Sequence, residues 1–426
     1  MDHSTTTRTR PHARLLSRLA VAGVIALVLA GLQSGVAAAR YPATIVVHPG
    51  QSIQAAVDRA GNGDTIKLDA GTWTEAVCVN GKGLNVVGAG RDLTKIVWPN
   101  WGSNSPPPEP TTGLTCWRAW AGADLEGNPT TLRDDVSGLF FLNPAGPVNV
   151  SGLQTVNHPA NGIIVWGGNN ANISNTKGTA HERYGVLAAA STNVNILNNI
   201  EQGLVRGAPF YSGTAGVSIG DSPYANANVA GNRISGYNLG VFVRESRSGV
   251  VSGNSVSGNC VGVLFFDDSA TEIPNVNGHV QGGNFTIQQN TSTSNNRYCI
   301  AGRDGSQRVS GVGMAVVNAD HVVVKSNVIR NNVPIVPSGQ SALTFPPGGL
   351  VLLSLAPPPD VNNAVDPGLV SYVTVTGNTI QNNVPVDIWL TRAVPGTPLR
   401  AAGPGNIIVN NTCGVSDPRG LCGPPS

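Results

Sequence analysis

Hydrophobic and polar positions repeat along this chain at an interval of just over twenty residues. Each repeat opens with a glycine and a short alternating apolar strand and continues to an asparagine turn, as in GVFVRESRSGVVSGNSVSGNC. The interval is 24 residues from Gly216 to Gly240 and 22 residues from Gly240 to Gly262. Such an interval is typical of one coil of a right-handed parallel β-helix. The pattern therefore predicts an all-β fold, a single-stranded β-helix whose coils build three parallel sheets.

The glycine-led strands and the asparagine turns should each stack from coil to coil. The strands open at Gly162, Gly185, Gly216, Gly240, Gly262, Gly313 and Gly349. Because side chains alternate along a strand, we expect Val217, Val241 and Val263 to fill one interior column. Asparagine tolerates tight turns and can hydrogen-bond along a stack. The turn residues expected to do so are Asn175, Asn198, Asn232, Asn254, Asn290, Asn327 and Asn378.

The segment before the first coil has the features of a cap. Ser52 is placed to be a helix N-cap, and apolar residues recur at helical spacing from Ile53 to Ala60, before Gly61. A short helix over residues 52–60 would cover the open end of the stack.

The first 39 residues have the pattern of a secretory signal. Four arginines precede an apolar stretch at 19–32, and three alanines at 37–39 offer a cleavage site. A membrane anchor is the alternative, but the apolar run is short for a span. We expect residues 1–39 to be a signal peptide and residues 40–426 to be the β-helix domain of a secreted, extracellular protein with no later membrane segment.

Composition and charge agree with a secreted solenoid. There are 53 glycines in 426 residues, with 5% aromatic and 12% charged residues, which suits tight turns and small stacked side chains. Without residues 1–39, the chain keeps 22 basic and 23 acidic residues. This balance gives no electrostatic footprint for nucleic acid, so none is expected as a partner. We expect a monomer.

Six cysteines in an exported chain indicate disulfides rather than a metal site, because no Cys-x-x-Cys motif or histidine cluster accompanies them. Six cysteines allow fifteen pairings. Their grouping along the chain suggests Cys78–Cys116, Cys260–Cys299 and Cys413–Cys422.

The run PGQSIQAAVDRAGNGDTIKLDAGTWTE, followed by LNVVGAG, resembles the N-terminal cap and first coil of the pectate-lyase-like superfamily. That superfamily includes pectin lyases, pectin methylesterases, polygalacturonases and uronate epimerases. Most of the chain also resembles a group of exported actinobacterial β-helix repeat proteins. The resemblance implies the fold and a carbohydrate ligand, not a particular substrate.

Extra residues fall next to the glycine-led strands rather than at the asparagine turns. The expected loop insertions are 98–147, 204–215, 267–283, 296–312, 333–348 and 356–371. Insertions there would wall the sheet that opens each coil, and the resemblance implies that a polymer would bind on this face. Tryptophans of the first insertion could stack on sugars or pack on the coils.

Alternation along the strands then names the candidate site residues. The candidates for catalysis are Asp221, Arg244, Glu245, Asp267, Asp268, His181 and Arg183, and those for substrate binding are Trp166, Tyr184, Tyr211, Tyr237, Phe242 and Phe266. We expect one polar cluster of Arg244, Glu245 and Asp267, joined by His181 and Arg183 from the facing wall. Acids beside cations and aromatic rings suit general acid–base work on saccharides.

Several chemistries fit these residues. A glycoside hydrolase needs two carboxyls, and the Asp267–Asp268 step is similar to one in polygalacturonases. A uronate lyase or epimerase needs a base and a cation, either arginine or bound Ca²⁺, which the acids could hold. A methylesterase is disfavoured because its glutamine donors are missing from this face. A non-catalytic solenoid that binds a surface or matrix is the alternative to an enzyme.

Overall fold

The computed structural model describes residues 41–99, 106–122, 132–204, 214–268, 281–301, 307–356 and 366–423. From Pro42 onward the chain forms one compact unit. The predicted signal peptide and Tyr211 lie outside the described residues. No helix in the described ranges is long and apolar enough to cross a membrane.

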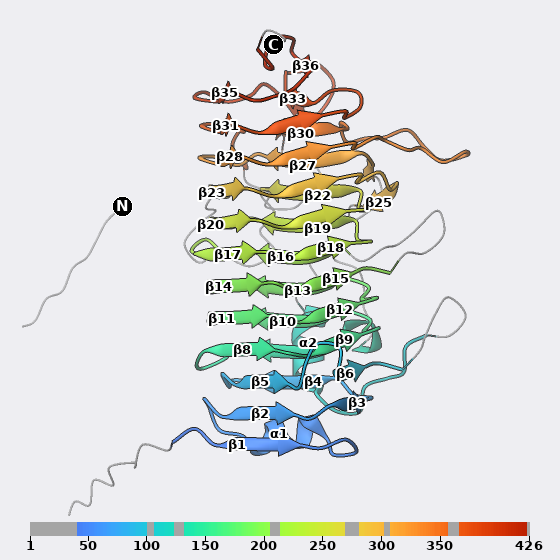
Figure 1. The fold of residues 1–426 in the computed structure, drawn as a ribbon, viewed down its shortest axis with the longest axis vertical. Helices are drawn as coiled ribbons and strands as arrows, with labels where there is room; N and C mark the ends of the chain where they lie inside the picture. The colour runs from blue at the N-terminus through green and yellow to red at the C-terminus, as the bar shows by residue number, and fades with distance from the viewer. Residues whose placement is uncertain are drawn as a thin grey trace, which may run out of the picture. The chain divides into compact units, whose positions relative to one another are not determined.

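Three parallel sheets run along the stack, and most coils add one strand to each (Figure 1). Sheet A is built from β1 (Thr44–Val47), β2 (Thr65–Leu68), β5 (Asn85–Gly88), β8 (Val148–Ser151), β11 (Asn169–Ser174), β14 (Thr192–Leu197), β17 (Ala227–Ala230), β20 (Arg247–Ser252), β23 (Gly283–Gln288), β28 (Val323–Lys325), β31 (Thr374–Thr376) and β35 (Ile407–Val409). Sheet B is built from β3 (Gly71–Trp73), β6 (Thr94–Val97), β9 (Gln154–Val156), β12 (Lys177–Thr179), β15 (Ile200–Gln202), β18 (Arg233–Ser235), β21 (Ser255–Ser257), β24 (Thr291–Thr293), β29 (Val328–Arg330) and β32 (Thr379–Gln381).

Sheet C contains the glycine-led strands. Its parallel members are β4 (Val77–Asn80), β7 (Leu139–Leu142), β10 (Ile163–Trp166), β13 (Tyr184–Ala189), β16 (Ala215–Gly220), β19 (Leu239–Arg244), β22 (Val261–Phe266), β27 (Val312–Val317), β30 (Gly348–Leu355), β33 (Ile388–Leu390) and β36 (Ser416–Asp417). One short antiparallel strand, β34 (Leu399–Arg400), pairs with β30, and β25 (Cys299–Ala301) and β26 (Gln307–Val309) form a separate hairpin.

The interior column predicted for sheet C is confirmed. Val217 pairs in register with Val241, and Val241 pairs with Val263. All three side chains are fully buried in one continuous apolar core. The opening glycines are required by close packing: a Cβ added at Gly240 would lie 2.4 Å from the carbonyl oxygen of Gly262.

The asparagine ladder between sheets A and B is also present. Asn232 donates through Nδ2 to Oδ1 of Asn254 at 2.9 Å, and Asn254 donates in the same way to Asn290 at 2.9 Å. The ladder continues through Asn327, Asn378 and Asn411.

At its N-terminal end the predicted ladder is wrong by one residue. Asn175 and Asn198 adopt left-handed φ angles of 52° and 57°, and the next residues, Thr176 and Asn199, turn inward and carry the hydrogen bonds. The left-handed residue makes the turn, so the ladder member is its successor.

A second ladder, which the sequence pattern did not reveal to us, follows the turn between sheets B and C. Each side-chain amide donates to the next coil, from Asn259 to Asn295, then Asn332 and Asn383. These asparagines are fully or almost fully buried, so the bonds satisfy polar groups that have no access to water.

The N-terminal cap is confirmed as α1 (Ile53–Arg59). Ser52 is its N-cap, with Oγ accepting from the backbone N–H of Ala55 at 3.1 Å. Ile53 and Val57 are buried against the first coil. This short helix hides apolar interior that the first coil would otherwise expose.

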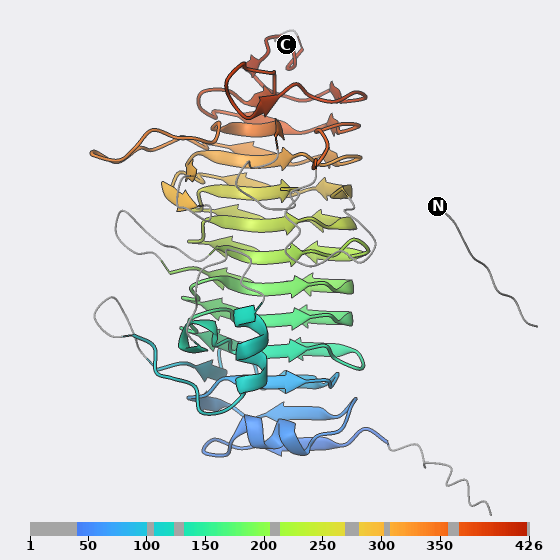
Figure 2. The ribbon, with the colours of Figure 1, turned by 180° about the vertical axis from the view of Figure 1, so that it is seen from behind.

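The first long insertion contains a helix that we did not expect, α2 (Leu114–Gly122), and a 3₁₀ turn at Leu132–Asp135. Figure 2 shows α2 lying across the strands near the N-terminal end of the stack. Trp117 and Trp120 of this helix are buried, so these two tryptophans pack on the coils. Trp101 lies outside the described residues.

All three predicted disulfides are confirmed, and none of the six cysteines is free. Cys78 of β4 forms a disulfide with Cys116 of α2. Cys260, at the start of the β22 coil, holds Cys299 of the hairpin, and Cys413–Cys422 closes a short C-terminal loop. Two of the bridges therefore fasten insertions to sheet C.

Candidate functional site

The outer face of sheet C carries two separate apolar clusters. Towards the N-terminal end, Trp117 and Trp120 of α2 pack on outward side chains of β7, β10 and β13. Towards the C-terminal end, outward side chains of β19, β22, β27 and β30 pack with Val309 and Phe345 from the insertions. Phe242 belongs to the second cluster and is 7% exposed. Phe242 is therefore largely covered, because insertions pack onto this sheet, and its role in substrate binding stays a prediction.

Polar candidates gather where the central strands of sheet C end. Arg244, the last residue of β19, donates to both carboxylate oxygens of Asp268, with Nη2 at 3.1 Å and 3.0 Å and Nε at 3.2 Å. Its Nη1 donates to Oδ1 of Asp221 at 3.3 Å. Glu245 follows Arg244 directly and lies beside both aspartates. We call Asp221, Arg244, Glu245 and Asp268 the acid cluster.

Strand register explains why these residues meet. Gly220 pairs with Arg244, and Arg244 pairs with Phe266 on the next coil. The residues that follow these strand ends therefore stack about 4.8 Å apart. A single guanidinium spans this spacing and reaches a carboxylate on either side, which fixes both aspartates.

Asp267 has a different role from the one expected. Its side chain is fully buried, with Oδ2 accepting from the backbone N–H of Gly282 at 2.6 Å, and its carbonyl accepts from Nδ2 of Asn318 at 2.9 Å. Asp267 thus links the end of β22 to Gly282, the residue before β23. The ion pair with Arg244 is made by Asp268, and the prediction that Asp267 belongs to the polar cluster is wrong.

Electrostatics in the acid cluster favour protonation of Glu245. Burial, a hydrogen bond with Asp268 and the nearby negative charges raise the pKa of Glu245 well above its usual range, against the opposing effect of Arg244. Burial also raises the pKa of Asp221, with Asp268 adding to the rise and Arg244 opposing it. Three carboxyls share one guanidinium, so the cluster holds a proton at a pH where isolated carboxyls have lost theirs.

The backbone at two of these acids is unusual. Asp221 and Glu245 have φ angles of 49° and 43°, in the left-handed region. Other turns at the equivalent place use Asn143, Gly167, Ala190 or Asn318. Asparagine and glycine are the residues that adopt this conformation readily, whereas glutamate seldom does.

His181 and Arg183 do not join the acid cluster. They precede β13, whereas Asp221 and Glu245 follow β16 and β19. Strands in a parallel sheet start at one edge and end at the other, and six residues separate these edges by about 20 Å. Arg183 pairs with Asp135 at 3.4 Å and lies over the Trp120 ring, 5.4 Å from its centre. The expected contact across the groove is therefore wrong.

His181 is an interior structural residue. It is fully buried and stacks on His158, with ring centres 5.5 Å apart. Its Nδ1 accepts from the backbone N–H of His158, and Nε2 lies 3.0 Å from Oγ1 of Thr155. Strand register places His181 at the turn position that Asn259 fills in a later coil. There the side chain of Asn259 likewise accepts from a backbone N–H of the preceding coil, that of Tyr237. Burial lowers the pKa of His181 to about 3.

This histidine pair predicts acid sensitivity. The folded pKa values of His158 and His181 both lie below 6.5, so the stability that they contribute is present above pH 6.5 and is lost as pH falls towards 3. We expect His181→Asn to flatten the fall in unfolding free energy between pH 6.5 and 4, by up to about 1.4 kcal/mol per pH unit. Denaturant titrations at several pH values measure this slope. Exposed His48 is the control: His48→Asn should keep the wild-type slope, and an unchanged slope in His181→Asn would refute the assignment.

Tyr237 is likewise buried in the core rather than exposed to a ligand. Its side chain has no exposed surface, and its hydroxyl has no hydrogen-bond partner. Burial raises the pKa of Tyr237 well above its usual value, and the Glu201 carboxyl adds to the rise. The expected role of Tyr237 in substrate binding is therefore wrong: its ring packs against Gly203 and Gly216 inside the coil.

Glu201 is a buried acid that sequence reasoning missed. It points inward from β15, is 1% exposed, and neither carboxylate oxygen has a hydrogen-bond partner. A Cβ added at Gly178 or Gly185 would collide with its Oε2, so glycines make room for it. Burial raises the pKa of Glu201 well above its usual value. The signal in the sequence is an acid at the inward position of a strand.

The remaining aromatic candidates keep some exposure. Trp166 ends β10 and meets Trp120 edge to face, with ring centres 5.9 Å apart. Tyr184 packs between the two outer apolar clusters, and Phe266 ends β22 beside Arg244. Phe266 is thus the predicted aromatic residue nearest in register to the acid cluster.

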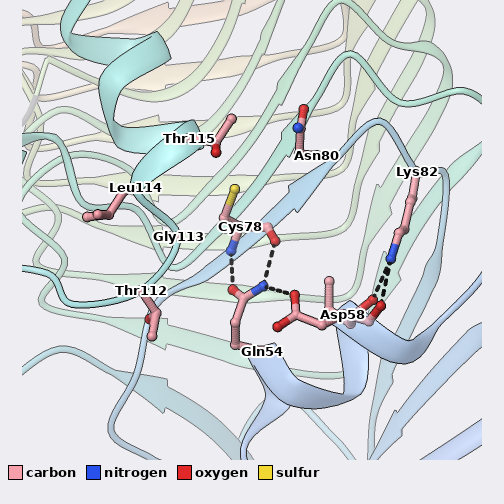
Figure 3. Close-up of a pocket in the computed structure, with 10 residues that line it drawn as sticks. Gln54, Asp58, Cys78, Asn80, Lys82, Thr112, Gly113, Leu114 and Thr115 are labelled. Carbon is pink, nitrogen blue, oxygen red and sulfur yellow. Dashed lines mark hydrogen bonds between the residues drawn. The ribbon is translucent and has the colours of Figure 1, made fainter.

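A cavity of about 300 Å³ lies elsewhere, between α1, β4 and the start of α2 (Figure 3). Gln54 exchanges hydrogen bonds with the backbone of Cys78 and donates to Asp58, while Lys82 donates to the carbonyls of Val57 and Asp58. These contacts join the cap to the first coil. None of the candidate site residues lines this cavity.

No group of three or more histidine, cysteine, aspartate or glutamate side chains within the described ranges has an arrangement that could hold a metal ion. In the acid cluster, the positive charge between the carboxylates is supplied by Arg244. The described residues thus offer no set of ligands for the Ca²⁺ that the sequence left open.

Comparison with known proteins bears on the fold. Residues 161–345, somewhat under half of the chain, match a family model described as a right-handed β-helix region. The fold is a right-handed parallel β-helix. No curated protein matches the sequence.

Several solved structures are similar to this chain. The catalytic domain of a GH87 α-1,3-glucanase in complex with nigerose is 16% identical, covering 88% of this chain and 65% of that one, with a TM-score of 0.48. A mutant of the periplasmic alginate epimerase AlgG is 14% identical, with 82% and 69% covered and a TM-score of 0.47. A Yersinia enterocolitica family 28 exopolygalacturonase is 11% identical, with 87% and 79% covered and a TM-score of 0.46. The chain spans about two thirds of the glucanase domain, and the likeness extends to the fold alone.

Proposed function

We propose that this protein is a secreted carbohydrate-active β-helix protein that hydrolyses a polysaccharide at the acid cluster. The observation that supports this most is the pairing of two kinds of carboxyl on neighbouring coils. Glu245 favours its protonated form, while both carboxylate oxygens of Asp268 accept hydrogen bonds from Arg244. Glycosidases need one carboxylic acid and one carboxylate beside the scissile bond.

In the proposed reaction, Glu245 gives its proton to the glycosidic oxygen as the bond from this oxygen to the anomeric carbon breaks. Asp268, the more exposed aspartate with a side chain 21% accessible, gives up its hydrogen bond with Glu245 as the glycan enters between the two carboxyls, and it takes a proton from the attacking water, whose oxygen bonds to the anomeric carbon. One water is consumed, and the proton on Asp268 returns to Glu245 through solvent. Arg244 and Asp221 are positioning residues, because they hold Asp268 in place.

Elimination or epimerisation of a uronate fits these residues less well. Both reactions need a cation that is available to the developing enolate. Arg244 already binds Asp221 and Asp268, and its side chain is 9% exposed. Hydrolysis is therefore the chemistry that the acid cluster favours.

Secretion is part of the proposal. The pattern of residues 1–39 is that of a signal peptide, and three disulfides require an oxidising compartment to form and persist.

The test is an assay of the purified mature protein on a panel of glycans. New reducing ends without the ultraviolet absorbance of an unsaturated uronate would indicate hydrolysis. Asp268→Asn should abolish the activity. Asp320→Asn is the matched control, because Asp320 also pairs with an arginine, Arg247 at 2.5 Å, but lies on the sheet A side of the coil.

No cleavage of any glycan, or equal loss in Asp268→Asn and Asp320→Asn, would contradict the proposal. Binding of a glycan without cleavage would favour the non-catalytic alternative.

A further inference from the structure

We infer that the acid cluster selects an uncharged glycan and discriminates against polymers of uronic acids. This inference rests on the proposed function and narrows its substrate class. Three observations support it: the three carboxyls of the acid cluster, the hydrogen bonds that already occupy the guanidinium of Arg244, and the aromatic ring of Phe266 beside the cluster.

The acid cluster contains more acidic than basic groups. Asp221, Glu245 and Asp268 surround one cation, Arg244. Burial raises the pKa of Glu245 and of Asp221, and both carboxyls share with Asp268 the same guanidinium. A sugar carboxylate brought to this place would be a fourth carboxyl beside one guanidinium, and removal of water from the site would strengthen the repulsion.

Arg244 is not available to compensate for a substrate carboxylate. Three of its contacts go to Asp268 and one to Asp221, which use both sides of its donor fork. A uronate could bind to Arg244 only by displacing Asp268, the residue proposed to activate water.

Two described arginines of nearby coils are occupied as well. Arg183 pairs with Asp135 at the opposite edge of sheet C, and Arg247 pairs with Asp320. In the part of the chain that the structure describes, no lysine or arginine other than Arg244 makes an ion pair with a member of the acid cluster.

The ring of Phe266 offers an apolar surface on which an uncharged sugar could pack without an ion pair. It pairs in register with Arg244 and is only partly buried. Apolar faces of sugar rings pack on aromatic side chains, and this contact needs no charge on the sugar. An aromatic ring beside an acid-rich cluster suits a polymer of neutral hexoses or pentoses.

The experiment uses matched pairs of polymers that differ only in charge. Polygalacturonate and alginate are compared with their carboxyl-reduced forms, and any neutral glycan that is cleaved is compared with a preparation partly oxidised at C6. We expect the neutral member of each cleaved pair to be hydrolysed at least tenfold faster. The difference should shrink as NaCl is raised from 20 to 500 mM, because salt screens repulsion between charges.

The outcomes separate the two proposals. Faster hydrolysis of the neutral members supports both. Hydrolysis that is equal for the two members, or faster for the charged one, overturns the charge selection and leaves the proposed hydrolase standing. Absence of cleavage across the whole panel overturns the proposed function and the inference with it.

Discussion

Glu245→Gln should slow glycan hydrolysis by about 10²- to 10⁴-fold, the usual contribution of a general acid. Glutamine has the shape of the protonated glutamate but cannot give a proton to the leaving oxygen. The loss should appear in turnover rather than in glycan binding, so kcat should fall with little change in affinity. Reducing-end assays and equilibrium binding to the cleaved glycan measure the two separately.

The pH profile gives a second measure of the same residue. The proposed mechanism requires protonated Glu245, whose pKa is raised, so the wild-type rate should persist above the ordinary range of a glutamate and fall as pH rises through the folded pKa. Glu245→Gln should lack this alkaline fall in its residual activity. Glu109→Gln is the control, because Glu109 is well exposed and contacts only Arg133 among the ion pairs described. Wild-type turnover in Glu245→Gln would remove Glu245 from the mechanism.

Glu201→Gln should stabilise the folded protein at neutral and alkaline pH. Glu201 is buried without hydrogen-bond partners, and its folded pKa is raised above the usual 4.5. A raised pKa means that its favourable contribution is complete below pH 4.5 and is lost as pH rises towards the folded value. The loss amounts to about 1.4 kcal/mol per pH unit over that window. Glutamine cannot ionise, so it avoids this loss.

Denaturant unfolding at pH 4.5, 7 and 9 tests the expectation. The variant and the wild type should be similar at pH 4.5, and the variant should gain with each step upward. Glu109→Gln, at an exposed acid far from the core, is the control and should not change the pH dependence by this amount. A variant that is less stable than wild type at pH 9 would show that the Glu201 carboxylate has a partner in the folded protein.

Much of the fold could be predicted because it repeats. The glycine-led strands recur often enough to fix both the interval and the inward face, and the neighbouring valines confirm the register. The disulfides follow from the grouping of cysteines. The helix α2 was missed because its short apolar segment lies in an insertion, where no periodic neighbour supports it.

The candidate site could be predicted only in part. Register brought Asp221, Arg244 and Glu245 together, as the equivalent positions required. Register could not say which of Asp267 and Asp268 faces Arg244, since this depends on the non-periodic contact between Asp267 and Gly282. Nor does alternation reveal that His181 and Tyr237 occupy turn positions whose side chains point into the solenoid.

The left-handed turn at Glu245 separates stability from activity. A non-glycine residue in this conformation costs roughly 1–2 kcal/mol, and asparagine, which other coils use here, tolerates it better. The scaffold alone would thus be improved by the substitution Glu245→Asn, which the proposed chemistry forbids. A gene library selected only for thermal resistance should therefore drift towards asparagine or glycine at 245 and lose its catalyst, whereas selection for growth on the glycan should hold the strained glutamate in place.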